Sequence, residues 1–337
     1  MKTLVCTQPG HFEYRTAPDP VLTPGHSIIR IKRIGICGTD LHAFEGTQPY
    51  FEYPRILGHE LAAEIIEPGD AVGFMPGDEV TIIPYFNCGH CIACRSGKPN
   101  CCVRLKVCGV HIDGSMAEYL SVPSHSLVHS SGLSLEELAL VEPLAIGAHG
   151  VRRAAITKGE FVLVVGAGPI GLGAMEFARI AGACVIAMDV NEQRLAFCAN
   201  NLKIDHTVNA LSPDVSKQLM DITHGDLPTV VMDATGSLKA INNSFQYMAH
   251  GGRYVLIGLQ KGDISFSHPE FHKREGTLMS SRNATREDFE QVISSFKTGL
   301  INPLTYITHR VSFDEVKDVF ADWLNPNSLV IKAMVSL

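Results

Sequence analysis

The sequence predicts an α/β protein with two domains, one β-rich and one doubly wound. Residues 1–150 form short β-branched segments separated by Gly and Pro, whereas from Glu160 apolar strands alternate with helical stretches. The chain of 337 residues is also longer than one average domain. After about residue 285 the pattern returns to helix and ends in an apolar strand at 329–335. We therefore expect residues 286–337 to rejoin residues 1–150, and residues 151–285 to form the α/β domain.

In the β-rich part, four segments combine β-branched residues with flanking turn residues, namely 27–36, 60–67, 78–84 and 116–122. In the α/β part, the continuous apolar run at 161–165 is typical of a buried parallel strand. Further apolar strands are expected at 184–188, 229–232, 254–257 and 277–279. A strand near 277–281 would lie at a sheet edge, where it could pair across a two-fold axis, because bare edges tend to be covered.

A glycine loop follows the strand at 161–165. Gly166 is expected to make the tight turn, Gly168 to let the backbone approach a pyrophosphate, and Gly171 to let helix and strand pack closely. The next residues form a helical pattern, with Ala174 in its apolar stripe and Glu176 and Arg179 turned outward. A lone GxGxxG motif is weak evidence, but the strand before it and the helix after it favour a dinucleotide site at the helix N-terminus.

Asp189 ends the next strand, eighteen residues after Gly171, where a ribose-binding carboxylate is expected. It would repel the 2′-phosphate of NADP by about 4 kcal/mol at 4 Å and an effective dielectric of 20. Val190 and Asn191 offer no compensating cation, so the sequence predicts NAD as the cofactor. The residues expected to bind it are Gly166, Gly168, Pro169, Ile170, Gly171, Asp189 and Arg194.

Four cysteines, Cys88, Cys91, Cys94 and Cys102, lie within fifteen residues. This spacing favours a closed four-thiolate zinc site, which is structural because no coordination position stays open. The alternative is two disulfides, as in an oxidising compartment. No secretory segment precedes the Gln8-Pro9-Gly10 turn, so we expect the reducing cytosol and a metal.

Composition argues against two classes of partner. The net charge is −7 and basic residues are scattered, which disfavours nucleic acid. No apolar run reaches the roughly 20 residues that a membrane-spanning helix needs.

A second, open metal site would supply alcohol chemistry, because a Lewis acid lowers the pKa of a hydroxyl group. Candidate ligands are Cys37, the adjacent pair His59 and Glu60, and Glu142, each beside a strand-like segment. Spacing alone leaves another interpretation open, since a lone cysteine is usually a small buried apolar group and a single His or Glu is usually a surface group.

The motifs GICGTD, GHE, the four-cysteine cluster, VEP and GAGPIG occur in an order that resembles the zinc-dependent medium-chain alcohol and polyol dehydrogenases. The resemblance runs over essentially the whole chain. It implies a GroES-like catalytic domain interrupted by a Rossmann domain, with the active site in the cleft between them. It also implies catalytic zinc on Cys37 and His59, structural zinc on the cluster with Cys102 rather than Cys101, and a homodimer or homotetramer.

Glu142 stands where alcohol dehydrogenases of this family have a second cysteine ligand, a pattern shared with sorbitol dehydrogenase-like enzymes. The resemblance implies that Glu142 binds zinc directly or through a water, with Glu60 as an alternate ligand or an outer group. Thr39 matches the hydroxyl residue that takes the alcohol proton, and His42 matches the histidine that relays it to solvent. A plain surface histidine is the alternative for His42.

A narrower likeness to bacterial L-galactonate 5-dehydrogenases is carried by GVHIDG, EYLSVP and GLQKGDISFSHPEFHKREGTLMSSRNAT. It implies oxidation of a sugar acid, L-galactonate, to D-tagaturonate with NAD. A carboxylate substrate needs a cation, best a bidentate arginine. Polyol dehydrogenases place one near Arg282, although an ion pair is an equal alternative there; Lys106, His111 and His272 are weaker candidates. Dehydrogenases of L-gulonate, L-threonine or a neutral polyol such as sorbitol, and a non-catalytic binding or structural protein, are the competing functions.

Overall fold

The computed structural model describes residues 1–49, 51–325 and 328–337. It divides into two compact units, Met1–Pro143 with Thr285–Leu337, and Leu144–Ala284. The first boundary falls before the one expected at residue 150, because helix α4 (Val141–Ala154) is continuous across it. Gly147 in α4 already packs against the second unit, where an added Cβ would lie 2.5 Å from the backbone nitrogen of Ala174.

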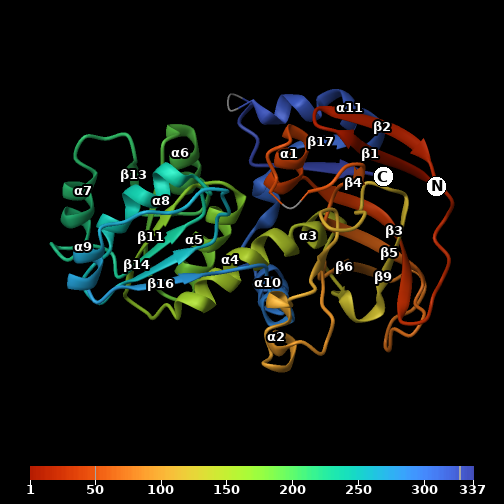
Figure 1. Cartoon of the computed structure of the whole chain (residues 1–337), viewed down its shortest axis with the longest axis horizontal. Coiled ribbons are helices and arrows are strands. Elements are labelled where there is room, and N and C mark those ends of the chain that lie inside the picture. The colour runs from red at the N-terminus through yellow and green to blue at the C-terminus, as the bar shows by residue number, and fades with distance from the viewer. Residues whose placement is uncertain (50, 326–327) are drawn as a thin grey trace. The chain divides into compact units, whose positions relative to one another are not determined.

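The first unit is the β-rich domain (Figure 1). Its strands are β1 (Lys2–Gln8), β2 (His11–Thr16), β3 (His26–Gly35), β4 (Arg55–Ile56), β5 (Glu60–Glu67), β6 (Glu79–Ile82), β7 (Tyr85–Phe86), β8 (Lys106–Val107), β9 (Tyr119–Pro123), β10 (Leu127–His129), β17 (Ile307–Ser312) and β18 (Lys332–Ser336). Its helices are α1 (Gly38–Glu45), α2 (Ile92–Arg95), α3 (Leu135–Ala139), the start of α4, α10 (Arg286–Lys297) and α11 (Val316–Val319).

The main sheet of this domain runs in the order β10-β6-β5-β3-β18-β17, with β9 also paired to β3. Smaller sheets, β2-β1-β4 and β7-β8, complete it. The C-terminal strand β18 pairs with β3, so the end of the chain does rejoin the first domain. A buried apolar core that includes Leu61, Ile65 and Val335 holds these strands together and fixes the ends of β3, β5 and β18 beside one another.

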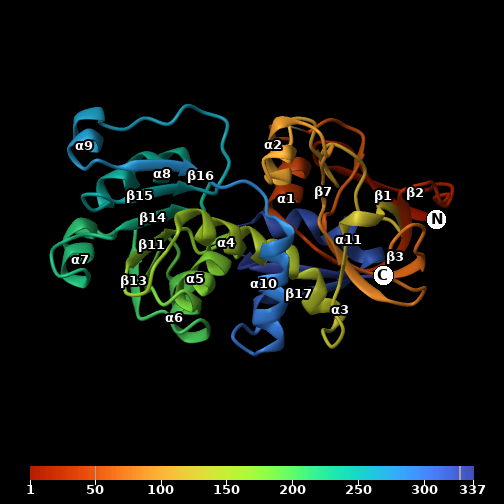
Figure 2. The same ribbon diagram turned by 90° about the horizontal axis from the view of Figure 1, so that it is seen from below.

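The second unit is a doubly wound α/β domain. Its six parallel strands run in the order β13-β12-β11-β14-β15-β16, the arrangement of a Rossmann fold. They are β11 (Phe161–Val165), β12 (Cys184–Asp189), β13 (His206–Asn209), β14 (Val230–Asp233), β15 (Arg253–Leu256) and β16 (Thr277–Ser280), with helices α5 (Pro169–Ile180), α6 (Glu192–Asn201), α7 (Val215–Ile222), α8 (Leu238–Ser244) and α9 (His268–Lys273). Figure 2 shows α5 and α6 on one face of the sheet and α8 on the other.

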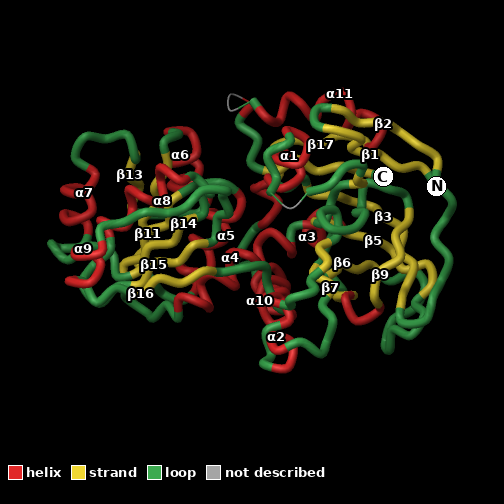
Figure 3. The backbone as a smooth tube through the Cα atoms, in the orientation of Figure 1, coloured by secondary structure: helices red, strands yellow, loops and turns green. Residues whose placement is uncertain are grey.

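The expected fold class is confirmed, and the differences lie in single elements (Figure 3). The short strand β13 was not expected, because its sequence His206-Thr-Val-Asn209 is too polar to stand out. The final strand begins at Lys332 instead of 329, since Leu329 has a positive φ of 55°. Glu176 was expected to point outward but is buried, and it pairs with the partly exposed Arg179 at 2.7 Å. Among the described residues, no helix has the length and apolar character needed to cross a membrane.

Candidate active site

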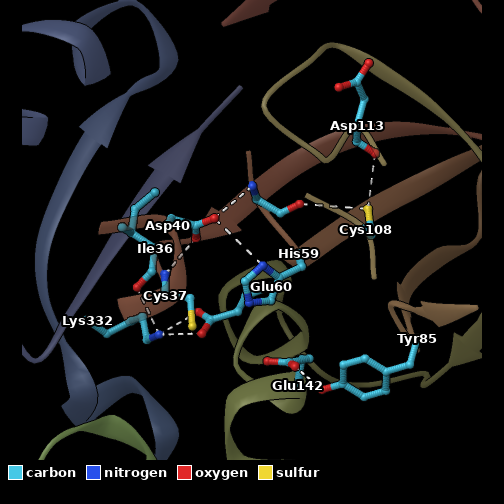
Figure 4. A network of polar contacts seen from close by, with 11 residues as sticks. Ile36, Cys37, Asp40, His59, Glu60, Tyr85, Cys108, Asp113, Glu142 and Lys332 are labelled. Atoms are coloured by element: carbon cyan, nitrogen blue, oxygen red, sulfur yellow. Dashed lines mark hydrogen bonds and ion pairs between the residues drawn. The ribbon is translucent and has the colours of Figure 1, made fainter. Parts of the chain in front are cut away.

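Cys37, His59 and Glu60 gather at one point of the β-rich domain, with one potential ligand atom from each lying within 4.8 Å of the others (Figure 4). Cys37 follows β3 and precedes α1, while His59 and Glu60 stand at the start of β5. The antiparallel register places Gly35 of β3 opposite Glu60. A Cβ on Gly35 would lie 2.4 Å from Glu60 Oε2, so the GIC segment needs glycine to make room for this carboxylate.

Asp40 organises the backbone around the site. Its buried carboxylate accepts hydrogen bonds from the amides of Cys37 at 2.9 Å and Gly58 at 3.0 Å, which ties α1 to the turn before β5. Asp40 Oδ1 also lies 3.8 Å from His59 Nδ1, a buried nitrogen with no hydrogen-bond partner. A carboxylate facing one ring nitrogen is the arrangement that orients a metal-binding histidine, and it leaves Nε2 available as a ligand.

Glu142 lies in the same buried region but outside the tight three-residue group. It stands in the first turn of α4, and the phenol of Tyr85 on β7 donates a hydrogen bond to its Oε1 (Figure 4). Both side chains are buried. The structure therefore gathers Glu60 with Cys37 and His59, whereas Glu142 is held by Tyr85 beside them.

Buried acidic groups lie around His59 and change its pKa. Burial alone would lower the pKa of His59, but the charges of Asp40 and then Cys37 raise it well above the usual range. Burial raises the pKa of Glu142 to about 7 and also raises that of Asp40. Anionic groups confined in a poorly solvated space favour a bound cation.

These residues fit a zinc ion. A thiolate, an imidazole and a carboxylate match the three protein ligands that zinc carries in catalytic sites, where a fourth position stays open. The unpartnered His59 Nδ1 beside Asp40 and the buried acidic groups agree with that chemistry. Zinc on these side chains would supply a Lewis acid.

The residues expected to move a proton lie on α1. Thr39 is half-buried in the first turn, whereas His42 is exposed, with its ring nitrogen Nδ1 3.2 Å from Thr47 Oγ1. Thr47 Oγ1 in turn donates to Glu45 at 3.0 Å. His42 is thus placed at the protein surface, as a proton outlet requires.

The four-cysteine lobe forms a second group. The ligand sulfurs of Cys88, Cys91, Cys94 and Cys102 lie within 4.8 Å of one another, and Cys101 beside them is exposed. Cys91 Sγ is 3.4 Å from Cys94 Sγ and 3.8 Å from Cys102 Sγ. Sulfurs at about 2.3 Å around a tetrahedral zinc are about 3.8 Å apart, whereas a disulfide needs about 2.05 Å.

The pKa values of these thiols differ: those of Cys88 and Cys91 are lowered, whereas burial raises the pKa of Cys102 to about 11. Amide hydrogen bonds, first from Cys94, lower the pKa of Cys91 to about 6. All ten cysteines lie in the described part of the chain and are free, so the disulfide alternative finds no support.

The glycine loop of the second domain has the features of a dinucleotide site. It follows β11, beside the point where the strand order reverses, which is where ligands bind in such sheets. Gly168 begins α5 with an open approach, while a Cβ on Gly171 would lie 1.8 Å from the carbonyl oxygen of Gly166. Helix and strand can therefore pack this closely only with glycine there. Pro169 and Ile170 form the first turn of α5.

Asp189 stands at the end of β12, and its carboxylate accepts from the amides of Ala167 at 2.7 Å and Asn191 at 2.9 Å. The side chain is therefore fixed beside the glycine loop. Arg194 in α6 reaches the same loop, with its guanidinium 3.9 Å from the position of a Cβ on Gly168.

Four cations were proposed for a substrate carboxylate. Arg282 is exposed and follows β16 in the second domain. Lys106 and His111 belong to the first domain, where the His111 ring accepts from the amide of Val107 at 3.1 Å, and His272 is in α9 of the second.

Sequence reasoning missed two residues of the site. Lys332 donates to both oxygens of Glu60, and Tyr85 donates to Glu142. The signal for Lys332 was a lysine inside the apolar segment Val330-Ile-Lys-Ala-Met-Val335, which predicts a buried and paired charge. Tyr85 had no comparable signal.

Comparison with known proteins decides the family. Residues 23–132 match the model of the alcohol dehydrogenase GroES-like domain, and residues 169–298 match that of zinc-binding dehydrogenases. The L-galactonate-5-dehydrogenase of Escherichia coli (strain K12) is 43% identical over 337 residues, covering 100% of this chain and 99% of that enzyme. This chain belongs to the zinc-dependent alcohol dehydrogenase family. The family expected from the motifs is confirmed.

Two further proteins extend the likeness. A sorbitol dehydrogenase of Halalkalibacterium halodurans is 35% identical over 324 residues, covering 94% of both chains. The alcohol dehydrogenase RspB of Escherichia coli CFT073, solved with NADH, superposes with a TM-score of 0.92 at 28% identity and covers 100% of this chain and 99% of that one. This protein is accordingly an oxidoreductase with a GroES-like and a Rossmann domain.

Proposed function

We propose that this protein oxidises a secondary alcohol of a sugar acid with NAD, and that its substrate is L-galactonate and its product D-tagaturonate. The observation that carries the chemistry is the group formed by Cys37, His59 and Glu60, a three-ligand set next to buried Glu142. The choice of substrate is supported by the 43% identity to L-galactonate-5-dehydrogenase over the full length of both chains.

The residues of this chain divide the work between two domains. Cys37, His59 and Glu60 would hold a zinc ion, which would supply a Lewis acid for the alcohol hydroxyl, and the glycine loop and Asp189 would hold NAD, which would supply the hydride acceptor. Thr39 takes the substrate hydroxyl proton while releasing its own hydroxyl proton toward His42, and His42 passes a proton to solvent. The products are a ketone, NADH and one proton. The glycine loop and Asp189 position the dinucleotide, and the four-cysteine group holds a structural zinc.

The substrate assignment is tested by following NADH formation at 340 nm with L-galactonate, L-gulonate, sorbitol and L-threonine. The expected result is the highest kcat/KM with L-galactonate and D-tagaturonate as the product. A higher kcat/KM with a neutral polyol or L-threonine would move the protein to another branch of the family. Cys37→Ser should abolish turnover with every substrate.

Metal analysis separates an enzyme from a non-catalytic protein on the same fold. Two zinc ions per chain are expected, one in each group of ligands. A content near one, together with no turnover, would favour a binding or structural role.

We also propose that the protein is cytoplasmic and that it forms a homodimer or homotetramer. The oligomer is supported by β16, which ends the parallel sheet with one edge unpaired among the described strands. Light scattering of the purified protein tests its oligomeric state.

A further inference from the structure

Lys332 is a buried lysine beside the proposed metal ligands. Its Nζ lies 2.7 Å from Glu60 Oε1, 2.6 Å from Glu60 Oε2 and 3.1 Å from the carbonyl oxygen of Ile36. The lysine side chain is 2% exposed and that of Glu60 is 1% exposed. All three donors of the ammonium group are thus used on acceptors at the ends of β3 and β5.

The position of Lys332 in the sheet holds its side chain beside Glu60. It is the first residue of β18, and Met334 of the same strand pairs with Gly35 in the middle of the sheet. Burying an ammonium group is costly unless it is paired, so the strand position and the ion pair hold each other in place. The ammonium nitrogen lies within 2.7 Å of both carboxylate oxygens of Glu60, which is the pairing that such burial requires.

The ion pair has a direct consequence for a metal ion. Both oxygens of Glu60 that zinc would use already accept hydrogen bonds from a cation. A carboxylate oxygen retains a lone pair for a second partner, but the ammonium charge opposes a divalent cation at the same place. The Lys332 ammonium group therefore competes with a metal ion for Glu60, one of the three proposed ligands.

We propose that Lys332 is a positioning residue that restrains Glu60 and competes with zinc for its carboxylate, so that the metal is held less tightly and its fourth coordination position stays open. This inference rests on the proposed zinc site at Cys37, His59 and Glu60. A Glu60 carboxylate free of Lys332 could offer both oxygens to the metal, and the second oxygen would take the position that Cys37, His59 and one Glu60 oxygen leave open. Lys332 opposes this, because its ammonium group already lies on both oxygens.

The test is Lys332→Met, which keeps the length and apolar stem of the side chain and removes its charge. We expect the catalytic zinc to leave about tenfold more slowly in a chelator competition: outer partners of metal ligands change metal affinity by about 10–100-fold, and the sign is reversed here because the partner removed is a cation. Cobalt substitution gives a second readout, because the visible absorption of Co²⁺ reports its coordination. The variant should show a more closed tetrahedral spectrum that responds less to added substrate alcohol.

Two variants serve as controls. Lys332→Arg retains the charge and should restore the wild-type chelation rate. Lys32→Met removes a partly exposed lysine that pairs with Glu64 at 3.1 Å in the same domain, and it should leave zinc release unchanged. Zinc release from Lys332→Met that is as fast as, or faster than, that from Lys32→Met would overturn the proposal.

A variant of Glu60 keeps the test decisive if Lys332→Met does not fold. Glu60→Gln leaves the ammonium charge without its anion and should lose zinc faster than wild type. Adding Lys332→Met to Glu60→Gln should then slow that loss, whereas no change on adding it would refute the competition.

Metal content separates this inference from the proposed function. Two zinc ions per chain with unchanged chelation in Lys332→Met would overturn the role of Lys332 alone. One zinc per chain in the wild-type protein would overturn both.

Discussion

Asp189 provides a sharp test of cofactor choice. Its carboxylate is fixed by two backbone amides, those of Ala167 and Asn191, at 2.7 and 2.9 Å. Because it cannot turn away without losing both hydrogen bonds, an anion placed on the 2′-oxygen of the adenosine ribose would meet the full charge. The adjacent Val190 is exposed and offers no compensating cation.

The size of the effect follows from Coulomb's law. Two unit charges at about 4 Å and an effective dielectric of about 20 repel by about 4 kcal/mol, which is a factor of about 10³ in an equilibrium constant. Salt does not remove this term, since the Debye length of about 8 Å at physiological ionic strength exceeds the separation. The wild-type protein should therefore prefer NAD over NADP by about 10³ in kcat/KM.

Asp189→Asn removes the charge and keeps the shape of the side chain. Its amide can accept only one of the two backbone hydrogen bonds, a loss of about 1 kcal/mol that affects both cofactors. The NAD to NADP ratio of kcat/KM should therefore fall by a factor of about 10² or more, while turnover with NAD falls less. Asp205→Asn is the matched control, because Asp205 is exposed just before β13, at the opposite end of the sheet. Comparable kcat/KM for both cofactors in the wild type, or an unchanged ratio in Asp189→Asn, would refute the reasoning.

Four further changes test the remaining assignments. Cys91→Ser should lower the thermal midpoint and disturb assembly before it affects hydride transfer, unlike Cys101→Ser at the exposed neighbour; an unchanged midpoint would contradict a structural zinc. His42→Gln should alter the pH dependence of turnover below neutrality, and an unaltered pH profile would remove His42 from the proton path. Arg282→Leu should raise KM for a sugar acid far more than for a neutral polyol, whereas equal effects would point to a structural role. Tyr85→Phe should lower the free energy of unfolding by about 1.5–3 kcal/mol with zinc content retained, because it removes the hydrogen-bond donor to buried Glu142; an unchanged free energy of unfolding would show that Glu142 does not depend on Tyr85.

The features that could be predicted from the sequence are short motifs of neighbouring residues. The glycine loop, the four-cysteine spacing and the apolar strand at 161–165 each carry their structural requirement within a few positions. Gly171 illustrates why, because the close approach to Gly166 that it permits is a local property of the turn. Glu176 is an exception, because the helical pattern placed it outward and its partner Arg179 lies only three residues away, yet the side chain is buried.

The distribution of roles among carboxylates could not be predicted in this way. Glu60 and Glu142 were both candidates for the metal, and spacing gave no reason to prefer one. Their roles depend on donors far away in the chain, since Lys332 is 272 residues from Glu60 and Tyr85 is 57 residues from Glu142. Register between β3 and β5 then places Glu60, and not Glu142, with Cys37 and His59.

Lys332 shows how such a partner can nevertheless be inferred. Residues 332–335 are buried, so the lysine lies in a strand whose two faces both lack solvent. An unpaired ammonium group there would cost several kcal/mol, far more than strand propensity could offset. A buried carboxylate must therefore face it, and the carboxylates available near an active site are metal ligands or their neighbours. A lysine inside an otherwise apolar strand thus predicts a buried carboxylate elsewhere in the chain. Here that carboxylate is Glu60, and in our proposal its restraint by Lys332 keeps the fourth coordination position of the metal open.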